Sequence, residues 1–305
     1  MLRLNDLILL LVIFLSILAG VLLPRFGSLF QPYILCFMMF FLFLSFLSIK
    51  LDTIWSTLRH SFPTILFLSF LKTIALPIGV YFLFRVIYPA YAIAALLLSG
   101  VSTGVVAPFI SNLVRANSSL VVVMVVITSL VVPFTLPAMI HILLERSIEL
   151  SVSPMIRMLT LVIFVPILAV ETLRRLTPGL IKGIMNRQFP LSLVIFSLIN
   201  LGVFSRYAEF LYQKPSTILV ALLVAIILSA IYLVVGVFSF STGSLENQLA
   251  AGISLGNMNN VLIIVFASQF FGPLEPTVAA MYMFPFFGMI LPIRIYRHWR
   301  LNRKT

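Results

Sequence analysis

Three asparagines, Asn257, Asn259 and Asn260, lie within four residues of one another inside a long apolar stretch. Gly256 and Ser254 lie just before them. An amide side chain at membrane depth is costly unless it faces other polar groups or a bound solute. We therefore expect these asparagines to interrupt a helix and to orient a solute by hydrogen bonds. A plain kink packed between helices is the alternative, but a kink does not need three amides.

A second polar interruption lies in the apolar stretch AIAALLLSGVSTGVVAPFISNLV, which contains Gly100, Ser102, Thr103, Gly104 and Pro108. Proline removes a backbone donor and clashes one turn back, and glycine weakens a helix. Unpaired backbone at membrane depth persists only where protein or a water-filled cavity surrounds it. Ser102 and Thr103 are therefore candidates to pair with the freed backbone groups and to bind a solute.

Lys72 is the one ionisable residue deep inside a predicted membrane span, in the sequence LSFLKTIALPIG. It lies about eleven residues from the predicted start of its span, which is near mid-depth at about 1.5 Å per residue. A charge at that depth is expensive and marks a functional site by default. The alternative is a side chain that snorkels to the interface, for which Lys72 is poorly placed.

The composition shows which kind of molecule must hold these residues. Of the 305 residues, 62% are apolar and 9% are charged, and the mean hydropathy is +1.19. These values exclude a soluble fold, and we expect a lipid bilayer around the chain. The net charge of +12 arises from basic residues between apolar runs. They set topology there, so no nucleic-acid partner is expected.

No reaction chemistry is evident in the sequence. It has one cysteine, and it shows no paired carboxylates, metal-ligand cluster, nucleophile–base pair or phosphate-binding loop. We therefore expect neither an enzyme nor a bound cofactor or metal. An intramembrane enzyme, a channel and a receptor-like membrane protein remain as alternatives to a transporter.

Ten helical spans account for the apolar runs, since only helices fit runs of this length in lipid. They fall at about 5–23, 31–49, 61–84, 90–114, 117–144, 154–173, 188–205, 214–240, 246–270 and 274–296. The second five begin about 150 residues after the first five. Because each set has an odd number of spans, the second set must enter the membrane from the opposite side to the first. This predicts an inverted repeat. The alternative is that evenly spaced helices match by coincidence.

The two polar interruptions occupy matching places in the two sets, in the fourth and ninth spans. Discontinuous helices at equivalent positions are the best sequence indication of a transport site. The side that carries both termini has about twice as many Lys and Arg residues as the other. We therefore predict an integral protein of a bacterial inner membrane with both termini in the cytoplasm.

Two stretches resemble the bile acid:sodium symporter superfamily, in its bacterial ten-helix type. TGVVAPFISNLVRANSSLVVVMVVITSLVVPFTLPAMIHILL is similar to its fourth and fifth spans. AAGISLGNMNNVLIIVFASQFFGPLEPTVAAMYMFPFFGMILPI is similar to its ninth and tenth spans. The resemblance implies ten helices, with panel helices in 1–60 and 151–206, core helices in 61–150 and 207–305, and spans four and nine crossing at their breaks. It also implies transport of a small organic anion, often driven by sodium.

The sodium-binding positions that the resemblance implies are substituted here. They fall on Ala107, Pro108, Val121, Val125, Ser254 and Met258. Sodium is a hard cation that needs several oxygen ligands, and these side chains offer almost none. Pro108 also gives a limited likeness to auxin-efflux-type carriers, a related group that is not sodium-coupled.

Lys72 stands where the resemblance places a glutamine ligand of the second sodium site, five residues before Pro77. An ammonium there can neutralise the carbonyl end of a half-helix as sodium would. We therefore expect Lys72 to replace the cation, either with a permanent charge or by exchanging a proton in each cycle. Sodium symport through backbone carbonyls is the alternative. The identity of the solute, the direction of transport and the oligomeric state stay open.

Overall fold

The structure is a computed structural model that describes residues 4–47, 49, 51–144, 151–241 and 243–302. Every regular element in these ranges is a helix, and one isolated β-bridge joins Thr103 to Met258. The predicted all-α fold is therefore confirmed. Five of the basic residues used to predict the topology lie outside the described residues, namely Arg3, Lys50, Arg146, Arg303 and Lys304.

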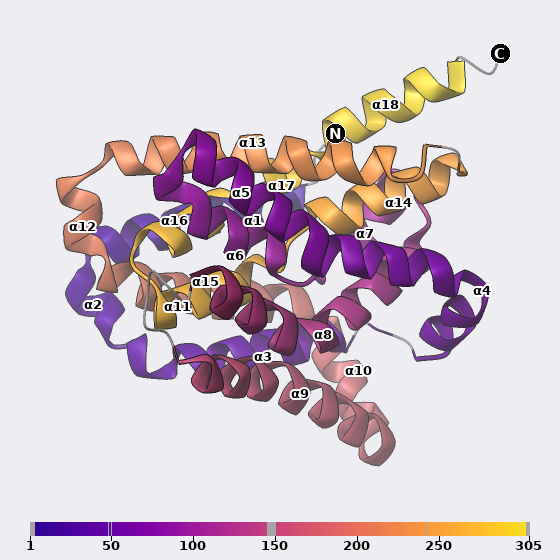
Figure 1. Cartoon of the computed structure of the whole chain (residues 1–305). Coiled ribbons are helices and arrows are strands. Elements are labelled where there is room, and N and C mark those ends of the chain that lie inside the picture. Colours follow the sequence, from indigo (N-terminus) through magenta and orange to yellow (C-terminus); the bar gives the residue numbers. More distant parts are fainter. Residues whose placement is uncertain (1–3, 48, 50, 145–150, 242, 303–305) are drawn as a thin grey trace.

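The first half of the chain runs from the N-terminus to the end of α8 (Figure 1). Its helices are α1 (Leu4–Leu22), α2 (Pro24–Ser28), α3 (Ile34–Phe46), α4 (Leu51–Phe70), α5 (Leu76–Ile87), α6 (Ala92–Gly100), α7 (Ala107–Leu113) and α8 (Ser118–Leu144). A π-helical turn, Leu71–Ala75, joins α4 to α5, and short 3-10 turns, Gln31–Tyr33 and Pro89–Tyr91, precede α3 and α6.

The second half continues from α9 to the C-terminal helix. Its helices are α9 (Val152–Leu176), α10 (Pro178–Asn186), α11 (Gln188–Arg206), α12 (Ala208–Gln213), α13 (Ser216–Phe238), α14 (Leu245–Gly256), α15 (Asn260–Phe270), α16 (Leu274–Met281), α17 (Met283–Gly288) and α18 (Ile290–Asn302). Helix α18 extends beyond the rest of the bundle (Figure 1).

Seven helical stretches in the described ranges are long and apolar enough to cross a membrane. They are Pro24–Phe46, Ile54–Ile87, Ser118–Leu144, Val152–Leu176, Gln188–Arg206, Ser216–Phe238 and Leu274–Asn302. Two shorter apolar helices, Pro89–Gly100 and Asn260–Phe270, belong to the predicted fourth and ninth spans. The full count of ten spans stays a prediction.

The helices pack in two groups. In one group α1 contacts α11, α11 contacts α3, and α3 contacts α9. In the other group α4 contacts α8, α5 contacts α6, and α13 contacts α14 and α16. Helices α3 and α9 lie on one side of the molecule in Figure 1, and α13 lies on the opposite side. The groups meet where α15 contacts α3 and α11, and where α8 contacts α9.

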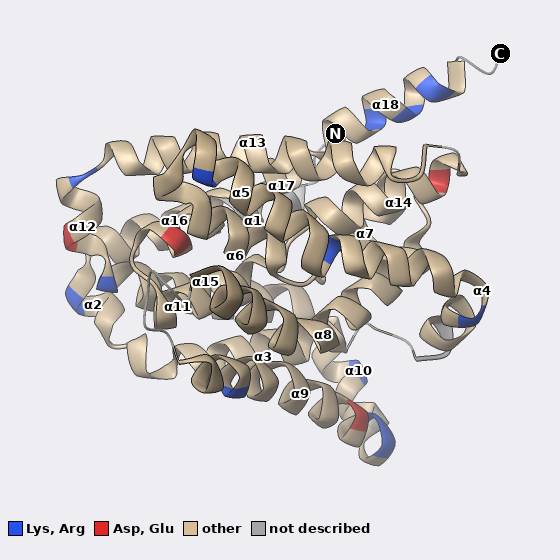
Figure 2. Ribbon diagram, in the orientation of Figure 1, with Lys and Arg blue, Asp and Glu red and all other residues tan. Residues whose placement is uncertain are grey.

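Charged and apolar residues are distributed as a bilayer requires. Lys and Arg lie mainly near the ends of the long helices and along α18 (Figure 2). Large apolar side chains face outward from the middle of α13, where Leu223 and Ile227 are exposed. Because lipid tails are apolar, such exposure is favourable in a membrane and would be a liability in water.

Candidate functional site

Both predicted interruptions are breaks in helices. The first lies between Gly100, where α6 ends, and Ala107, where α7 begins. The second lies between Gly256, where α14 ends, and Asn260, where α15 begins. The non-helical segments are thus 101–106 and 257–259.

The sequence predicted breaks that extend one to three residues further at their edges than those in the structure. Gly100 and Gly256 are the last residues of their helices, and Asn260 is the first residue of its helix. Pro108 is the second residue of α7, where a proline ring fits because the N–H has no helical partner. Ser254 lies in the last turn of α14 and is therefore helical.

The two breaks cross each other as an antiparallel bridge between Thr103 and Met258. The N–H of Gly104 donates to the carbonyl of Asn257 (2.7 Å), and the N–H of Asn259 donates to the carbonyl of Ser102 (2.9 Å). The crossing is confirmed, and it gives freed backbone groups partners that lipid cannot supply.

Gly104 is required by how closely the two chains approach at the crossing. A Cβ atom at this position would lie 2.5 Å from the carbonyl oxygen of Met258. That oxygen belongs to the backbone of the bridge itself, so it cannot move aside as the end of a side chain could. Glycine therefore sets the distance between the two breaks.

Polar side chains hold the carbonyl end of the half-helix α14. Thr103 Oγ1 donates to the carbonyl of Ser254 (2.8 Å), and its N–H donates to Thr128 Oγ1 (3.0 Å). The hydroxyl of Tyr282 donates to the carbonyl of Gly256 (2.6 Å). Tyr282 is fully buried against the crossing.

Lys72 lies at the same place, in the π-helical turn between α4 and α5. Its side chain is 0% exposed, so it does not snorkel. Its Nζ donates to the carbonyl of Ser99 (3.0 Å), in the last turn of α6, and contacts Met258 Sδ. The ring centroid of Tyr232 is 6.0 Å away. The Lys72 amino group thus lies at the negative end of the α6 dipole.

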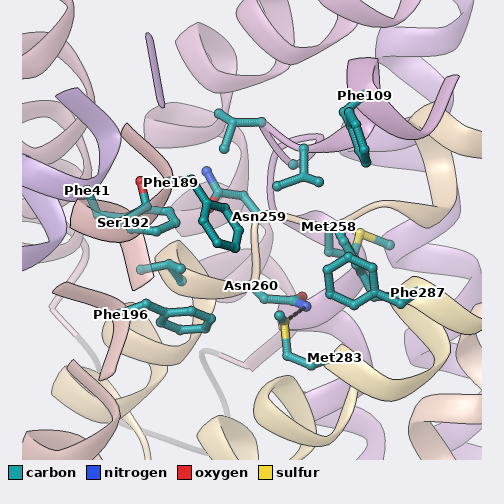
Figure 3. Close-up of a pocket in the computed structure, with 15 residues that line it drawn as sticks. Phe41, Phe109, Phe189, Ser192, Phe196, Met258, Asn259, Asn260, Met283 and Phe287 are labelled. Carbon is teal, nitrogen blue, oxygen red and sulfur yellow. Dashed lines mark hydrogen bonds between the residues drawn. The ribbon is translucent and has the colours of Figure 1, made fainter. Parts of the chain in front are cut away.

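A cavity of about 300 Å³ adjoins the crossing (Figure 3). It is lined by Phe41, Gly104, Val105, Val106, Phe109, Phe189, Ser192, Phe196, Met258, Asn259, Asn260, Val261, Met283, Phe286 and Phe287. Helices α3 and α11 therefore form one wall, and α7, α15 and α17 form the other. No charged side chain is among these lining residues of the described chain.

Of the residues predicted to bind a solute, the structure brings Asn259 and Asn260 to the cavity wall. Ser102, Thr103 and Asn257 are buried in the crossing and are not among its lining residues. Sequence reasoning missed the aromatic wall, because phenylalanines in an apolar chain give no distinguishing signal.

The amino end of α15 points its first turn into this cavity. Asn259 Oδ1 accepts from the N–H of Leu262 (3.3 Å) and so caps the helix. Asn260 Nδ2 donates to Met283 Sδ (2.7 Å), and Asn260 Oδ1 has no partner among the described residues. Positive dipole charge and buried amides at one wall suit a polar or anionic group.

The match to a known family model covers residues 32–214, which is more than half of the chain. The model describes the sodium bile acid symporter family. The chain belongs to this family. The predicted resemblance is confirmed, and the protein is a transporter of the bile-acid-symporter type in a membrane. A search of curated proteins finds no match.

The family match includes the first break and stops before the second. It spans α3 to α12 and ends at residue 214, whereas α14 and α15 follow it. The crossing between 101–106 and 257–259 therefore comes from the structure and not from the family match.

Proposed function

We propose that the protein is a secondary transporter that carries a small organic anion by alternating access. The observation that carries this proposal is the cavity at the crossing, because it places the amino end of α15 and two buried amides against a space of solute size. Family membership supports transport of a small molecule.

The two groups of helices supply the moving parts in this proposal. Helices in 1–60 and 151–206 form a panel, and helices in 61–150 and 207–305 form a core. The two halves of the chain are related to each other by an inverted repeat. The cavity lies at their junction, with α3 and α11 on the panel side. Rocking of one group against the other then exposes the same site to either side.

The lining of the cavity favours an amphipathic anion. Six phenylalanines can pack against an apolar body, while Asn259, Asn260 and Ser192 offer hydrogen bonds to a polar end. The positive end of the α15 dipole favours a carboxylate or sulfonate over a cation. These polar side chains are amides and a hydroxyl, which bind a solute without forming an acid–base pair, and this supports transport over catalysis.

Lys72 replaces a coupling cation in this proposal. The resemblance places a ligand of the second sodium site at Lys72 and another sodium-binding position at Met258, and these two side chains are in contact here. The ammonium already donates to the carbonyl of Ser99, which a bound cation would otherwise satisfy. Val121 and Val125, at positions implied for the first sodium site, are fully buried and offer no side-chain oxygen.

The decisive experiment is uptake into proteoliposomes with a radiolabelled bile acid and a panel of smaller carboxylates. Sodium is replaced by choline at fixed pH, and a pH series follows. We expect uptake by the wild type to persist in choline. A proton-coupled cycle would make uptake follow the pH gradient, and a permanently charged Lys72 would leave it indifferent to the gradient.

Lys72→Gln restores the side chain that the resemblance implies, and we expect it to make uptake sodium-dependent or to abolish it. The control is Lys182→Gln on the exposed face of α10, which makes the same chemical change away from the crossing. Strict sodium dependence of the wild type would refute the cation replacement. Normal uptake and an unchanged pH profile in Lys72→Gln would leave Lys72 with a packing role only.

A further inference from the structure

Two neighbouring side chains at the end of α11 converge on one backbone carbonyl of α15. Arg206 ends α11, and Tyr207 follows it. Arg206 Nη1 and the Tyr207 hydroxyl both donate to the carbonyl oxygen of Ser268, at 3.1 Å each. Ser268 lies in the last turn of α15, where carbonyls lack partners within the helix.

These contacts lie at the opposite end of α11 from the cavity. Phe189, Ser192 and Phe196 line the cavity from the amino-terminal half of α11, and Asn260 lines it from the start of α15. From Phe196 to Arg206 a helix rises about 15 Å. The amino-terminal parts of α11 and α15 thus line the cavity, and hydrogen bonds join the two helices at their carboxyl-terminal ends.

The contacts are placed so that water can reach them. Arg206 is exposed, and a recess of about 270 Å³ beside it is lined by Gln31, Arg206 and Ser268, among others. Water can therefore replace both donors when the helices part, which keeps the bonds reversible. Burial raises the pKa of the Tyr207 hydroxyl above its ordinary value, so this group stays protonated and remains a donor.

We propose that Arg206 and Tyr207 form a latch to the Ser268 carbonyl that keeps the transporter closed on the side away from the cavity. Release of the latch lets α11 separate from α15 there, so that the binding cavity opens to that side. The inference rests on the proposed alternating-access function and adds the residues that control one of its two gates.

The test uses a cysteine reporter in the cavity wall. Cys36, which is exposed on α3, is first changed to serine, and Ser192→Cys is introduced. A membrane-impermeant thiol reagent is added to right-side-out or inside-out vesicles, and the labelling rate is measured from each side. In the parent protein we expect labelling from the cavity side and slow labelling from the Arg206 side.

The latch variant Arg206→Gln with Tyr207→Phe should raise the labelling rate from the Arg206 side several-fold and lower the rate from the cavity side. Lys214→Gln is the matched control, because it removes a positive charge at the same end without touching Ser268. If the double variant fails to reconstitute, Tyr207→Phe alone removes one donor and should shift both rates in the same directions by a smaller factor.

Labelling rates that match the parent from both sides would overturn the latch, and so would an equal shift in Lys214→Gln. The labelling needs no substrate. If labelling does not shift but the protein still takes up anions, the latch is refuted and the proposed function stands. If labelling shifts but the protein takes up no anion, the latch is supported and the proposed substrate class is contradicted.

Discussion

Lys72 and Tyr282 serve the same purpose at two different half-helices. Each donates from a fully buried position to a carbonyl near the end of a half-helix, Lys72 to Ser99 and Tyr282 to Gly256. Such carbonyls are left unpaired wherever a helix stops, and in a membrane the missing partner is costly. The protein therefore supplies from its own side chains what a bound ion or water would otherwise provide.

Gly104→Ala should disturb the crossing more than any other single methyl group added there. The new Cβ would meet the Met258 carbonyl oxygen at 2.5 Å, and backbone must shift to relieve the clash. We expect a loss of about 1–3 kcal/mol, as for other overpacked sites, and a sharp fall in uptake. Thermal unfolding in detergent measures the first effect.

Gly79→Ala is the matched control for this prediction, because its added Cβ would have no atom within 4 Å. It should leave both the unfolding temperature and uptake nearly unchanged. Equal unfolding temperatures for Gly104→Ala and Gly79→Ala would contradict the requirement for glycine at the crossing.

The π-helical turn between α4 and α5 decides where Lys72 points. Wider turns of this kind insert one extra residue into a helix and are frequent at functional sites. The turn Leu71–Ala75 brings Lys72 against α6 and Met258, while Thr73 Oγ1 donates to the carbonyl of Ser69 (2.7 Å) within the widened turn. An unbroken α-helix would present Lys72 at a different angle around the helix axis.

Helices α13 and α14 depend on two glycines for their close contact. A Cβ on Gly236 would lie 2.6 Å from the Cα of Gly252 and 2.8 Å from the carbonyl oxygen of Ala251. Gly236→Ala should therefore push α14 away and lower stability by about 1–3 kcal/mol. Because α14 carries one side of the crossing, we also expect weaker binding of the transported anion.

A change at Gly288 provides the comparison for α13 and α14, since its added Cβ would meet nothing within 4 Å. Circular dichroism melts of Gly236→Ala and Gly288→Ala in the same detergent should differ by several degrees. If Gly236→Ala melts with the wild type, the close approach of α13 and α14 does not limit stability.

At the scale of the whole molecule, the charge distribution predicts its orientation. Basic residues gather on α18, which carries Arg294, Arg297 and Arg300. This helix extends from the bundle (Figure 2). Lys and Arg on short loops are retained in the cytoplasm. A cysteine added after Thr305 in a Cys36→Ser background should resist an impermeant reagent in intact cells and react after permeabilisation. Labelling in intact cells would reverse the orientation.

The class of the molecule and the places where its helices break could be predicted from the amino-acid sequence. High apolar content and few charges leave only membrane helices, and Gly, Pro and Asn act locally on the chain that contains them. The breaks at 101–106 and 257–259 could therefore be predicted to within three residues. Lys72 could also be singled out, because an ionisable residue contrasts with the apolar residues around it.

Which polar residues face the cavity and which hold the crossing depends on how the helices pack, and the sequence did not reveal it. Asn259 lines the cavity and Asn257 does not, although they are two residues apart. The walls of Phe41 and Phe196 and the role of Tyr282 also required the fold. The physical reason is that lipid is as apolar as a protein core, so hydrophobic periodicity does not distinguish the buried face of a membrane helix from its lipid face.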